Sequence, residues 1–387
     1  MLPAPHSLPV SPIRFEKPGC KGDAIRAQQV LRGPSDGYLE PIGSIWFATC
    51  SHNSVRRLHV FIFWFVLGVA APAIARADVA LFLEEPYGTF GGMNPTGHAS
   101  VYLSRVCAAS PISLRRCEPG EQGVVISRYH RVGGYDWLAI PLIPYLYAVD
   151  KADEVPDRVN AEQVASLRDD YRRRHLEKIV PDDPDDSMPK GDWIQLIGAS
   201  YDRTIYSFEI ETSEEQDNQL IEAFNEGPNK NHFNLFFSNC SDFVRHVIDF
   251  YYPKAIHRNF TADVGIMTPK QAAKCLVKYA KQHPELQFSS FAIGQVSGTV
   301  PRSSAVRGVL ESLVKSKRYV VPLTSLAVIQ PYLGGGLIYA WAGSGRFNPR
   351  RLTQDSDAEA PPETFSEELE SNRVARPSYV MGYLGSR

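Results

Sequence analysis

A chain of 387 residues, 43% of them hydrophobic, is long enough for one large domain or two small ones with a buried core. Its formal net charge of -2 gives no electrostatic reason to expect a nucleic-acid partner, so we exclude that class of function. Six cysteines are too few to form a disulfide scaffold in a chain of this length.

Residues 55–77 have the pattern of a signal peptide. Two arginines precede an apolar run from residue 58 to residue 71, and the segment closes on Ala75-Arg76-Ala77. A basic start, an apolar centre and small residues at the cleavage site are what a signal peptidase requires. We therefore predict export, with the folded protein starting near Asp78. A buried core helix and an uncleaved signal anchor are the alternatives.

Residues 1–54 are irregular, with prolines scattered through them and no amphipathic period. A signal peptide normally stands at the N-terminus of a protein. We therefore interpret this extension as the result of a start assigned too early, and we expect the natural start near Val55. The extension takes no part in the predicted fold.

The segment 78–290 combines strand-like runs with amphipathic helices, which predicts an α+β domain. Helix starts are indicated by Asn160, by the capping box that Ser213 opens, and by Thr268 followed by a proline. The strand-like runs are residues 79–83, 98–103, 123–131, 201–211 and 234–237.

Cys107 and Cys117 bracket an excursion that contains proline and serine. Both cysteines would be exported, and disulfides form in oxidising compartments. We therefore interpret them as a possible disulfide that closes this loop.

Cys240 is the residue with most chemistry in the sequence. It follows the expected strand 234–237 and opens a segment of helical apolar spacing that Pro253 stops. The positive end of a helix lowers the pKa of a cysteine, and the unpaired N–H groups of the first turn can stabilise an oxyanion. Cys240 is therefore a candidate nucleophile, and Asn239, Ser241 and Tyr87 are candidates to support the site or the oxyanion.

A nucleophilic cysteine needs a histidine that takes its proton and returns it to the leaving group. His98, which begins a strand directly after Gly97, is the best placed candidate. A third polar group would orient the imidazole. We expect His130 in that role, with Ser127 and Glu121 as second choices.

Two alternatives leave Cys240 without a catalytic role. Free cysteines are often inert buried residues, and Cys240 could also pair with Cys275 in a disulfide. No group of residues has the spacing of a zinc site, so we expect no metal and no cofactor.

The residues Asn239-Cys240-Ser241-Asp242-Phe243-Val244 resemble the Asn-Cys-x-x-Phe motif of circularly permuted papain-like enzymes. This group includes lecithin:retinol acyltransferase-like proteins and bacterial cell-wall amidases. Residues 97–103 resemble their catalytic histidine strand, and His98 precedes Cys240 as in permuted members. The resemblance implies a domain in which an antiparallel sheet packs against helices, with a Cys–His thiol hydrolase or acyltransferase activity that proceeds through an acyl-enzyme.

The C-terminal part contains one uncharged apolar stretch. Residues 319–342 include no charged side chain and are long enough to cross a bilayer. We predict a membrane anchor there, with a buried hairpin as the alternative. Residues 291–318 would be a linker, and residues 343–387 a disordered polar tail.

The sequence thus favours an exported, membrane-anchored enzyme of the periplasm or cell envelope. Its substrate would be an amide or ester in that envelope, either a peptidoglycan peptide or a lipid. The alternative is a non-catalytic envelope protein that keeps the same fold as a binding or scaffolding module.

Overall fold

The computed structural model describes residues 77–88, 96–130, 132–185, 188–230, 232–315 and 347–356, together with short stretches between 325 and 339. Apart from Ala77, the predicted signal peptide and the stretch before it lie outside these residues.

A six-stranded sheet forms the centre of the described chain, in the order β6-β5-β2-β1-β8-β9. Every neighbouring pair is antiparallel. The fold is therefore α+β, with an antiparallel sheet that packs against helices. The strands are β1 (Ala77–Glu84), β2 (His98–Leu103), β5 (Val124–Ser127), β6 (Leu138–Pro141), β8 (Ile205–Thr212) and β9 (Ser289–Ile293).

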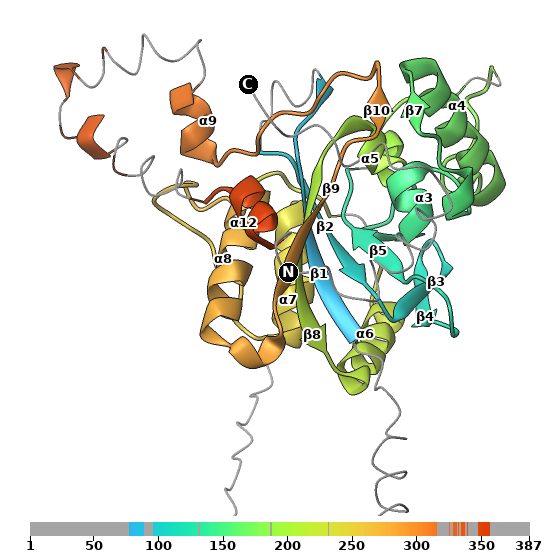
Figure 1. Cartoon of the computed structure of the whole chain (residues 1–387), viewed down its shortest axis with the longest axis horizontal. Helices are drawn as coiled ribbons and strands as arrows, with labels where there is room; N and C mark the ends of the chain where they lie inside the picture. The colour runs from blue at the N-terminus through green and yellow to red at the C-terminus, as the bar shows by residue number, and fades with distance from the viewer. Residues whose placement is uncertain are drawn as a thin grey trace, which may run out of the picture. The chain divides into compact units, whose positions relative to one another are not determined.

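Helices and loops cover both faces of this sheet, which is why β1 is apolar at nearly every position. Val79, Leu81 and Leu83 point into one core with α7 (Cys240–Tyr251) and α8 (Pro269–Gln282). Ala80 and Phe82 point into a second core with α3 (Leu142–Tyr147), α4 (Ala161–Tyr171) and α5 (Ala199–Asp202). Figure 1 shows α7 and α8 on one side of the sheet and α3, α4 and α5 on the other.

The three predicted helix starts are confirmed. Asn160, Ser213 and Thr268 each accept a hydrogen bond from a first-turn backbone N–H of α4, α6 (Glu214–Glu226) and α8. After α4 the chain continues in a short π-helix, η2 (Arg172–Leu176). The smaller elements are β7 (Arg158–Val159), β10 (Ser297–Gly298), η1 (Ala152–Glu154), η3 (Asp192–Leu196) and η4 (Pro284–Leu286).

The predicted strand 234–237 is wrong, because these residues form a tight turn. The Asn234 side-chain oxygen accepts hydrogen bonds from the backbone N–H groups of Phe236 and Phe237, at 2.9 and 3.2 Å. Two backbone hydrogen bonds between Asn234 and Ser238 close the turn. A local side-chain bond of this kind competes with an extended strand.

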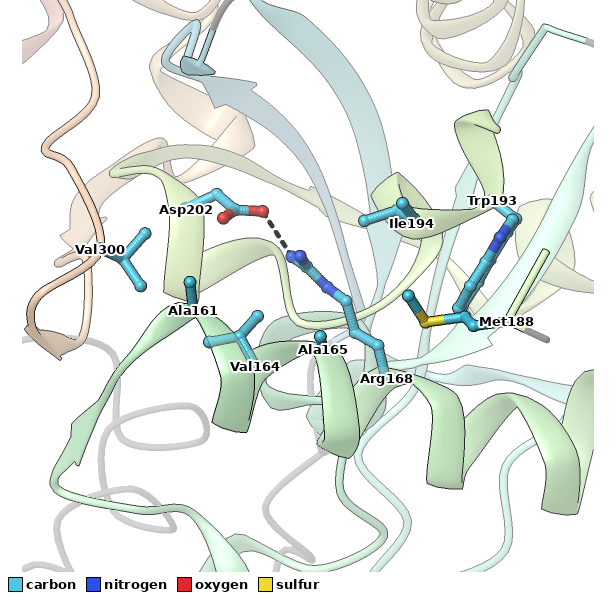
Figure 2. A pocket seen from close by; sticks show the side chains of 9 residues that line it. All are labelled: Ala161, Val164, Ala165, Arg168, Met188, Trp193, Ile194, Asp202 and Val300. Atoms are coloured by element: carbon cyan, nitrogen blue, oxygen red, sulfur yellow. Dashed lines mark hydrogen bonds and ion pairs between the residues drawn. The ribbon is translucent and has the colours of Figure 1, made fainter. Parts of the chain in front are cut away.

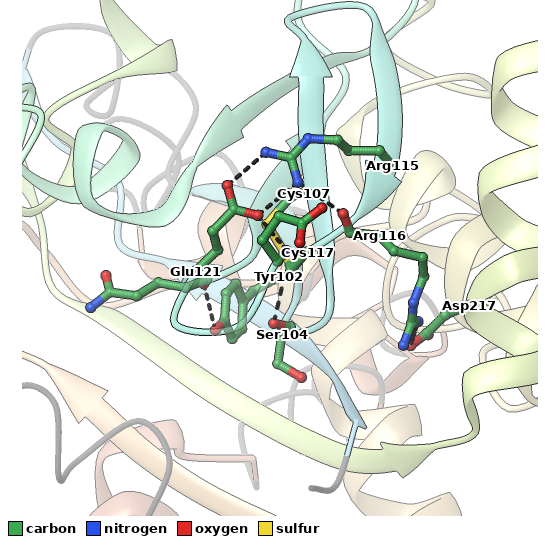
Figure 3. The surroundings of a disulfide bond; sticks show 10 residues. Tyr102, Ser104, Cys107, Arg115, Arg116, Cys117, Glu121 and Asp217 are labelled. Atoms are coloured by element: carbon green, nitrogen blue, oxygen red, sulfur yellow. Dashed lines mark hydrogen bonds and ion pairs between the residues drawn. A yellow bond between two sulfur atoms is a disulfide. The ribbon is translucent and has the colours of Figure 1, made fainter.

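The excursion between Cys107 and Cys117 is a hairpin of β3 (Val106–Ser110) and β4 (Ser113–Arg116). A disulfide joins the two cysteines, as Figure 3 shows. Next to it, Arg115 forms an ion pair with Glu121 at 2.6 Å and lowers the pKa of that carboxyl to about 2. Glu121 is therefore paired with the hairpin residue Arg115 and does not orient the His98 ring.

The C-terminal boundaries differ from those expected. The predicted domain ends at residue 290, but β9 continues beyond it as part of the sheet. The predicted linker 291–318 contains a helix, α9 (Val309–Lys315). The predicted disordered tail 343–387 contains α12 (Pro349–Ser356), which packs on β9. One contact that holds this helix is an ion pair with a buried carboxylate. Glu85 is 1% exposed, and Arg350 of α12 reaches it at 3.0 Å, so the helix compensates its charge.

The predicted anchor 319–342 lies largely outside the described residues. Within the part of the chain that is described, no helix combines the length and the apolarity that crossing a membrane requires.

Candidate active site

Cys240 occupies the first position of α7, and Asn239 fixes it there. The Asn239 Oδ1 atom accepts from the N–H groups of Ser241 and Asp242, at 2.8 and 3.0 Å. The Asp242 carboxylate accepts in return from the Asn239 N–H, which completes a capping box. The sulfur therefore lies at the positive end of the helix dipole, as predicted.

Two arginines brace the turn before Cys240. Arg258 forms an ion pair with Asp242 and donates to the carbonyl of Phe236 at 3.1 Å. Arg128, which follows β5, donates to the Ser238 hydroxyl at 3.0 Å. The position of the sulfur is thus fixed from outside α7 as well as by its cap.

His98 begins β2, and Gly97 allows the close approach that places it. Gly97 has φ +76°, and a Cβ at this position would lie 2.2 Å from the carbonyl oxygen of Glu84. The pairing of β1 with β2 sets Glu84 opposite His98. The imidazole is buried and stacks on the ring of Tyr129, with centroids 5.0 Å apart.

Cys240 and His98 line the same cavity and lie close enough for each to shift the pKa of the other. Burial raises the pKa of the Cys240 thiol, but the His98 imidazole, with smaller contributions from the Ala99 backbone and the Ser241 hydroxyl, outweighs burial, and the pKa falls below its ordinary value. Burial lowers the pKa of His98, but the Cys240 thiolate and then the Glu84 carboxylate raise it, and the net shift is upward. Both shifts favour a thiolate–imidazolium pair.

Ser127, and not His130, lies within hydrogen-bond distance of the His98 ring. His98 Nε2 lies 2.9 Å from the Ser127 hydroxyl, which donates its own hydrogen to the Ala99 carbonyl at 3.0 Å. The serine oxygen therefore accepts from Nε2–H, which leaves Nδ1 to exchange a proton with the sulfur.

His130 in the orienting role is therefore a wrong prediction. Its ring is 46% exposed and lies 3.4 Å from the carboxylate of Asp192. β2 pairs with β5 so that Val101 faces Ile126, and continuing this register sets His98 against Tyr129. Side chains alternate between the faces of a sheet, so Ser127 and Tyr129 share the face of His98 and His130 does not.

A buried polar network lies behind His98. Glu84 is 0% exposed and pairs with the buried guanidinium of Arg203 at 2.9 Å. It also accepts from the hydroxyl of Ser100, at 2.9 Å, and from that of Tyr145. This network holds a negative charge beside the imidazole without exposing it to solvent.

The residues predicted to support the site or the oxyanion, Asn239, Ser241 and Tyr87, differ in what they contact. The Asn239 amide donates to the carbonyls of Leu235 and Met267, each at 3.0 Å, so it braces the turn and is not free for an oxyanion. The Ser241 hydroxyl lies 3.9 Å from the Cys240 sulfur. The Tyr87 ring lines the same cavity as Cys240, and Arg203 lies 4.5 Å from its centre. The backbone N–H of Cys240 is the first-turn donor that an oxyanion would reach.

A cavity of about 590 Å³ opens onto Cys240 and His98. Its polar wall includes Arg128 and the His130–Asp192 pair, and its apolar wall includes Phe233 and Met267. A smaller pocket of about 170 Å³ lies between α4 and η3, as Figure 2 shows, with the ion pair of Arg168 and Asp202 in its wall. It contains none of the predicted site residues.

Cys240 and Cys275 are both free, so the alternative of a disulfide between them is wrong. Cys275 is buried on α8, its sulfur lies 3.6 Å from His257 Nδ1, and burial raises its thiol pKa. The two cysteines therefore differ in the sign of their pKa shifts, although each has a histidine beside it.

No protein-family model matches this chain, and no curated protein matches it. Among solved structures, the crystal structure of a type VI secretion system effector, TseH, is similar at 12% sequence identity and a TM-score of 0.26. The similarity covers 56% of this chain and 99% of the effector.

Proposed function

We propose that this chain is an exported Cys–His thiol hydrolase or acyltransferase with a permuted papain-like domain, acting through an acyl-enzyme on an amide or ester of the cell envelope. The observation that carries the proposal is that Cys240 and His98 line one cavity close together, where their mutual charge effect lowers the pKa of the thiol and raises that of the imidazole. Perturbed groups that line one cavity are typical of catalytic sites.

Acylation would begin with attack of the Cys240 thiolate on the carbonyl carbon of the substrate. The negative charge that forms on the carbonyl oxygen would be stabilised by the Cys240 backbone N–H and the positive end of α7. The His98 imidazolium would give its proton to the leaving amine or alkoxide as the scissile bond breaks. The products of this step are a thioester on Cys240 and a neutral imidazole.

Deacylation would use the same residues in the reverse direction. Neutral His98 would take a proton from a water molecule or an acceptor amine, which attacks the thioester carbonyl. The sulfur would leave as a thiolate and pair again with the imidazolium. Ser127 would keep the ring in one orientation through both steps by accepting from Nε2–H.

The cavity suits a substrate with both polar and apolar parts. Arg128 and His130 can face a carboxylate or a phosphate, and Phe233 and Met267 can face an aliphatic chain. A peptidoglycan peptide and a lipid acyl group both meet this description. The proposed location is the envelope, where the apolar segment 319–342 would keep the domain close to either substrate.

The test is to trap the acyl-enzyme. The full chain is incubated with stem-peptide muropeptides or with phospholipid, quenched in acid and digested, and the peptide that contains Cys240 is examined by mass spectrometry. We expect an adduct of the mass of one acyl group on Cys240, absent in Cys240→Ala and retained in the matched control Cys275→Ser. A Cys240 that forms no adduct and reacts with thiol reagents no faster than Cys275 would favour the scaffolding module.

A further inference from the structure

Five large apolar side chains are exposed on two loops, one of which borders the cavity through Leu235. Phe237 is 74% exposed and Phe260 is 78% exposed, and their three neighbours are more than half exposed. We name this set the apolar rim; it consists of Leu235, Phe236, Phe237, Phe260 and Val264. Contiguous exposed apolar side chains in a folded protein mark an interaction surface.

The two loops that carry the apolar rim are held in place by one arginine. Arg258 donates to the carbonyls of Phe236 and Phe237 in the first loop, at 3.1 and 3.3 Å, and to that of Gly265 in the second, at 2.7 Å. Its guanidinium also lies 5.8 Å from the centre of the Phe237 ring. The aromatic side chains are therefore held outward while the backbone carbonyls behind them are satisfied.

The rim is continuous with the cavity and with α9. Leu235 belongs to both the rim and the cavity wall. The first N–H groups of α9 bond to the loop that carries Phe260 and Val264: Val309 donates to the Asp263 carboxylate at 2.9 Å, and Leu310 to the Ala262 carbonyl at 3.3 Å.

In the sequence, α9 is followed almost directly by the apolar segment 319–342. It ends at Lys315, and the uncharged stretch 319–342 follows with only Lys317 and Arg318 as charged residues between them. Four described residues of that stretch are highly exposed, so they do not cover the rim: Val328, Ile329, Tyr332 and Tyr339.

We propose that the apolar rim docks onto a lipid bilayer, with Phe237 and Phe260 inserted at the level of the headgroups. Aromatic rings on loop tips whose backbone groups are satisfied internally suit a membrane interface, where unpaired backbone groups are costly. Lys317 and Arg318 follow α9 in the sequence, and basic residues of this kind suit anionic headgroups. The cavity would then open at the membrane surface. This surface does not depend on whether Cys240 is a nucleophile.

Tryptophan fluorescence can report on the rim in the full chain. Phe237→Trp is a conservative change at an exposed position, and subtracting the emission of the unaltered chain removes the five native tryptophans. We expect vesicles of phosphatidylcholine and phosphatidylglycerol to shift this difference emission to the blue, and brominated lipid to quench it. Met188→Trp is the matched control, since Met188 is an exposed apolar residue at the small pocket, and its difference emission should not change.

Each other outcome overturns the proposal. A difference emission that vesicles leave unchanged means that residue 237 does not enter the bilayer, even if the chain floats with the vesicles. A blue shift that grows with protein concentration in the absence of lipid identifies a second copy of this chain as the occupant. Emission that is already blue in dilute buffer identifies a segment of the chain itself.

Discussion

Replacing His98 with alanine is expected to lower kcat/KM by about 100- to 10,000-fold, the range over which a positioned general acid and base acts. The variant would lose the imidazole that both lowers the pKa of Cys240 and protonates the leaving group. The measurement is turnover of the substrate identified by acyl-enzyme trapping, at a pH where the unaltered enzyme is most active.

Two further variants separate the role of His98 from general damage to the cavity. Ser127→Ala removes one hydrogen bond to the ring and should lower kcat about fivefold, because a single hydrogen bond contributes about 1 kcal/mol. His130→Ala should raise KM, because that ring lines the cavity, and should leave kcat unchanged, because the ring lies against Asp192 and not against the catalytic pair. A His130→Ala variant as inactive as His98→Ala would contradict the assignment of Ser127.

Replacing Arg203 with leucine is expected to lower the free energy of unfolding by about 3–5 kcal/mol, because it leaves a buried charge unpaired. Glu84 of β1 and Arg203, which follows α5, are almost completely buried and lie 2.9 Å apart. A loss of this size should lower the melting temperature by about 10 °C in a domain of this length. Thermal unfolding followed by circular dichroism measures the change.

The matched control is Arg115→Leu, which breaks an ion pair between two half-exposed side chains. Arg115 and Glu121 are 39% and 36% exposed, so the loss should stay below about 1 kcal/mol. The double variant Glu84→Gln with Arg203→Leu should recover part of the stability, since it removes both charges. Equal effects of Arg203→Leu and Arg115→Leu would show that the buried network does not support the fold.

The parts of the fold that depend on near neighbours in the chain are those that sequence reasoning predicts. Asn160, Ser213 and Thr268 cap helices through side-chain bonds that span three residues. The place of Cys240 at the start of α7 is equally local, because the Asn239 cap decides it.

Features that depend on strand register or on distant partners do not follow from the sequence alone. The choice between Ser127 and His130 depends on which residue of β5 faces His98, and a shift of one residue reverses it. The partnership of Glu84 with Arg203 joins β1 to the start of β8, and that of Glu85 with Arg350 joins β1 to α12. Two consecutive glutamates at the end of an apolar strand were the available signal, because buried carboxylates require cationic partners.

The most direct test of the account is the pH dependence of Cys240 alkylation by iodoacetamide, followed on its own peptide by mass spectrometry. Only the thiolate reacts, so the midpoint of the rate profile reports the pKa of the thiol. We predict a midpoint below the ordinary cysteine value, and a higher midpoint in His98→Ala, where the imidazole no longer offsets the effect of burial on the sulfur. Superimposable profiles for the two proteins, or an unshifted midpoint in the unaltered chain, would contradict the thiolate–imidazolium pair.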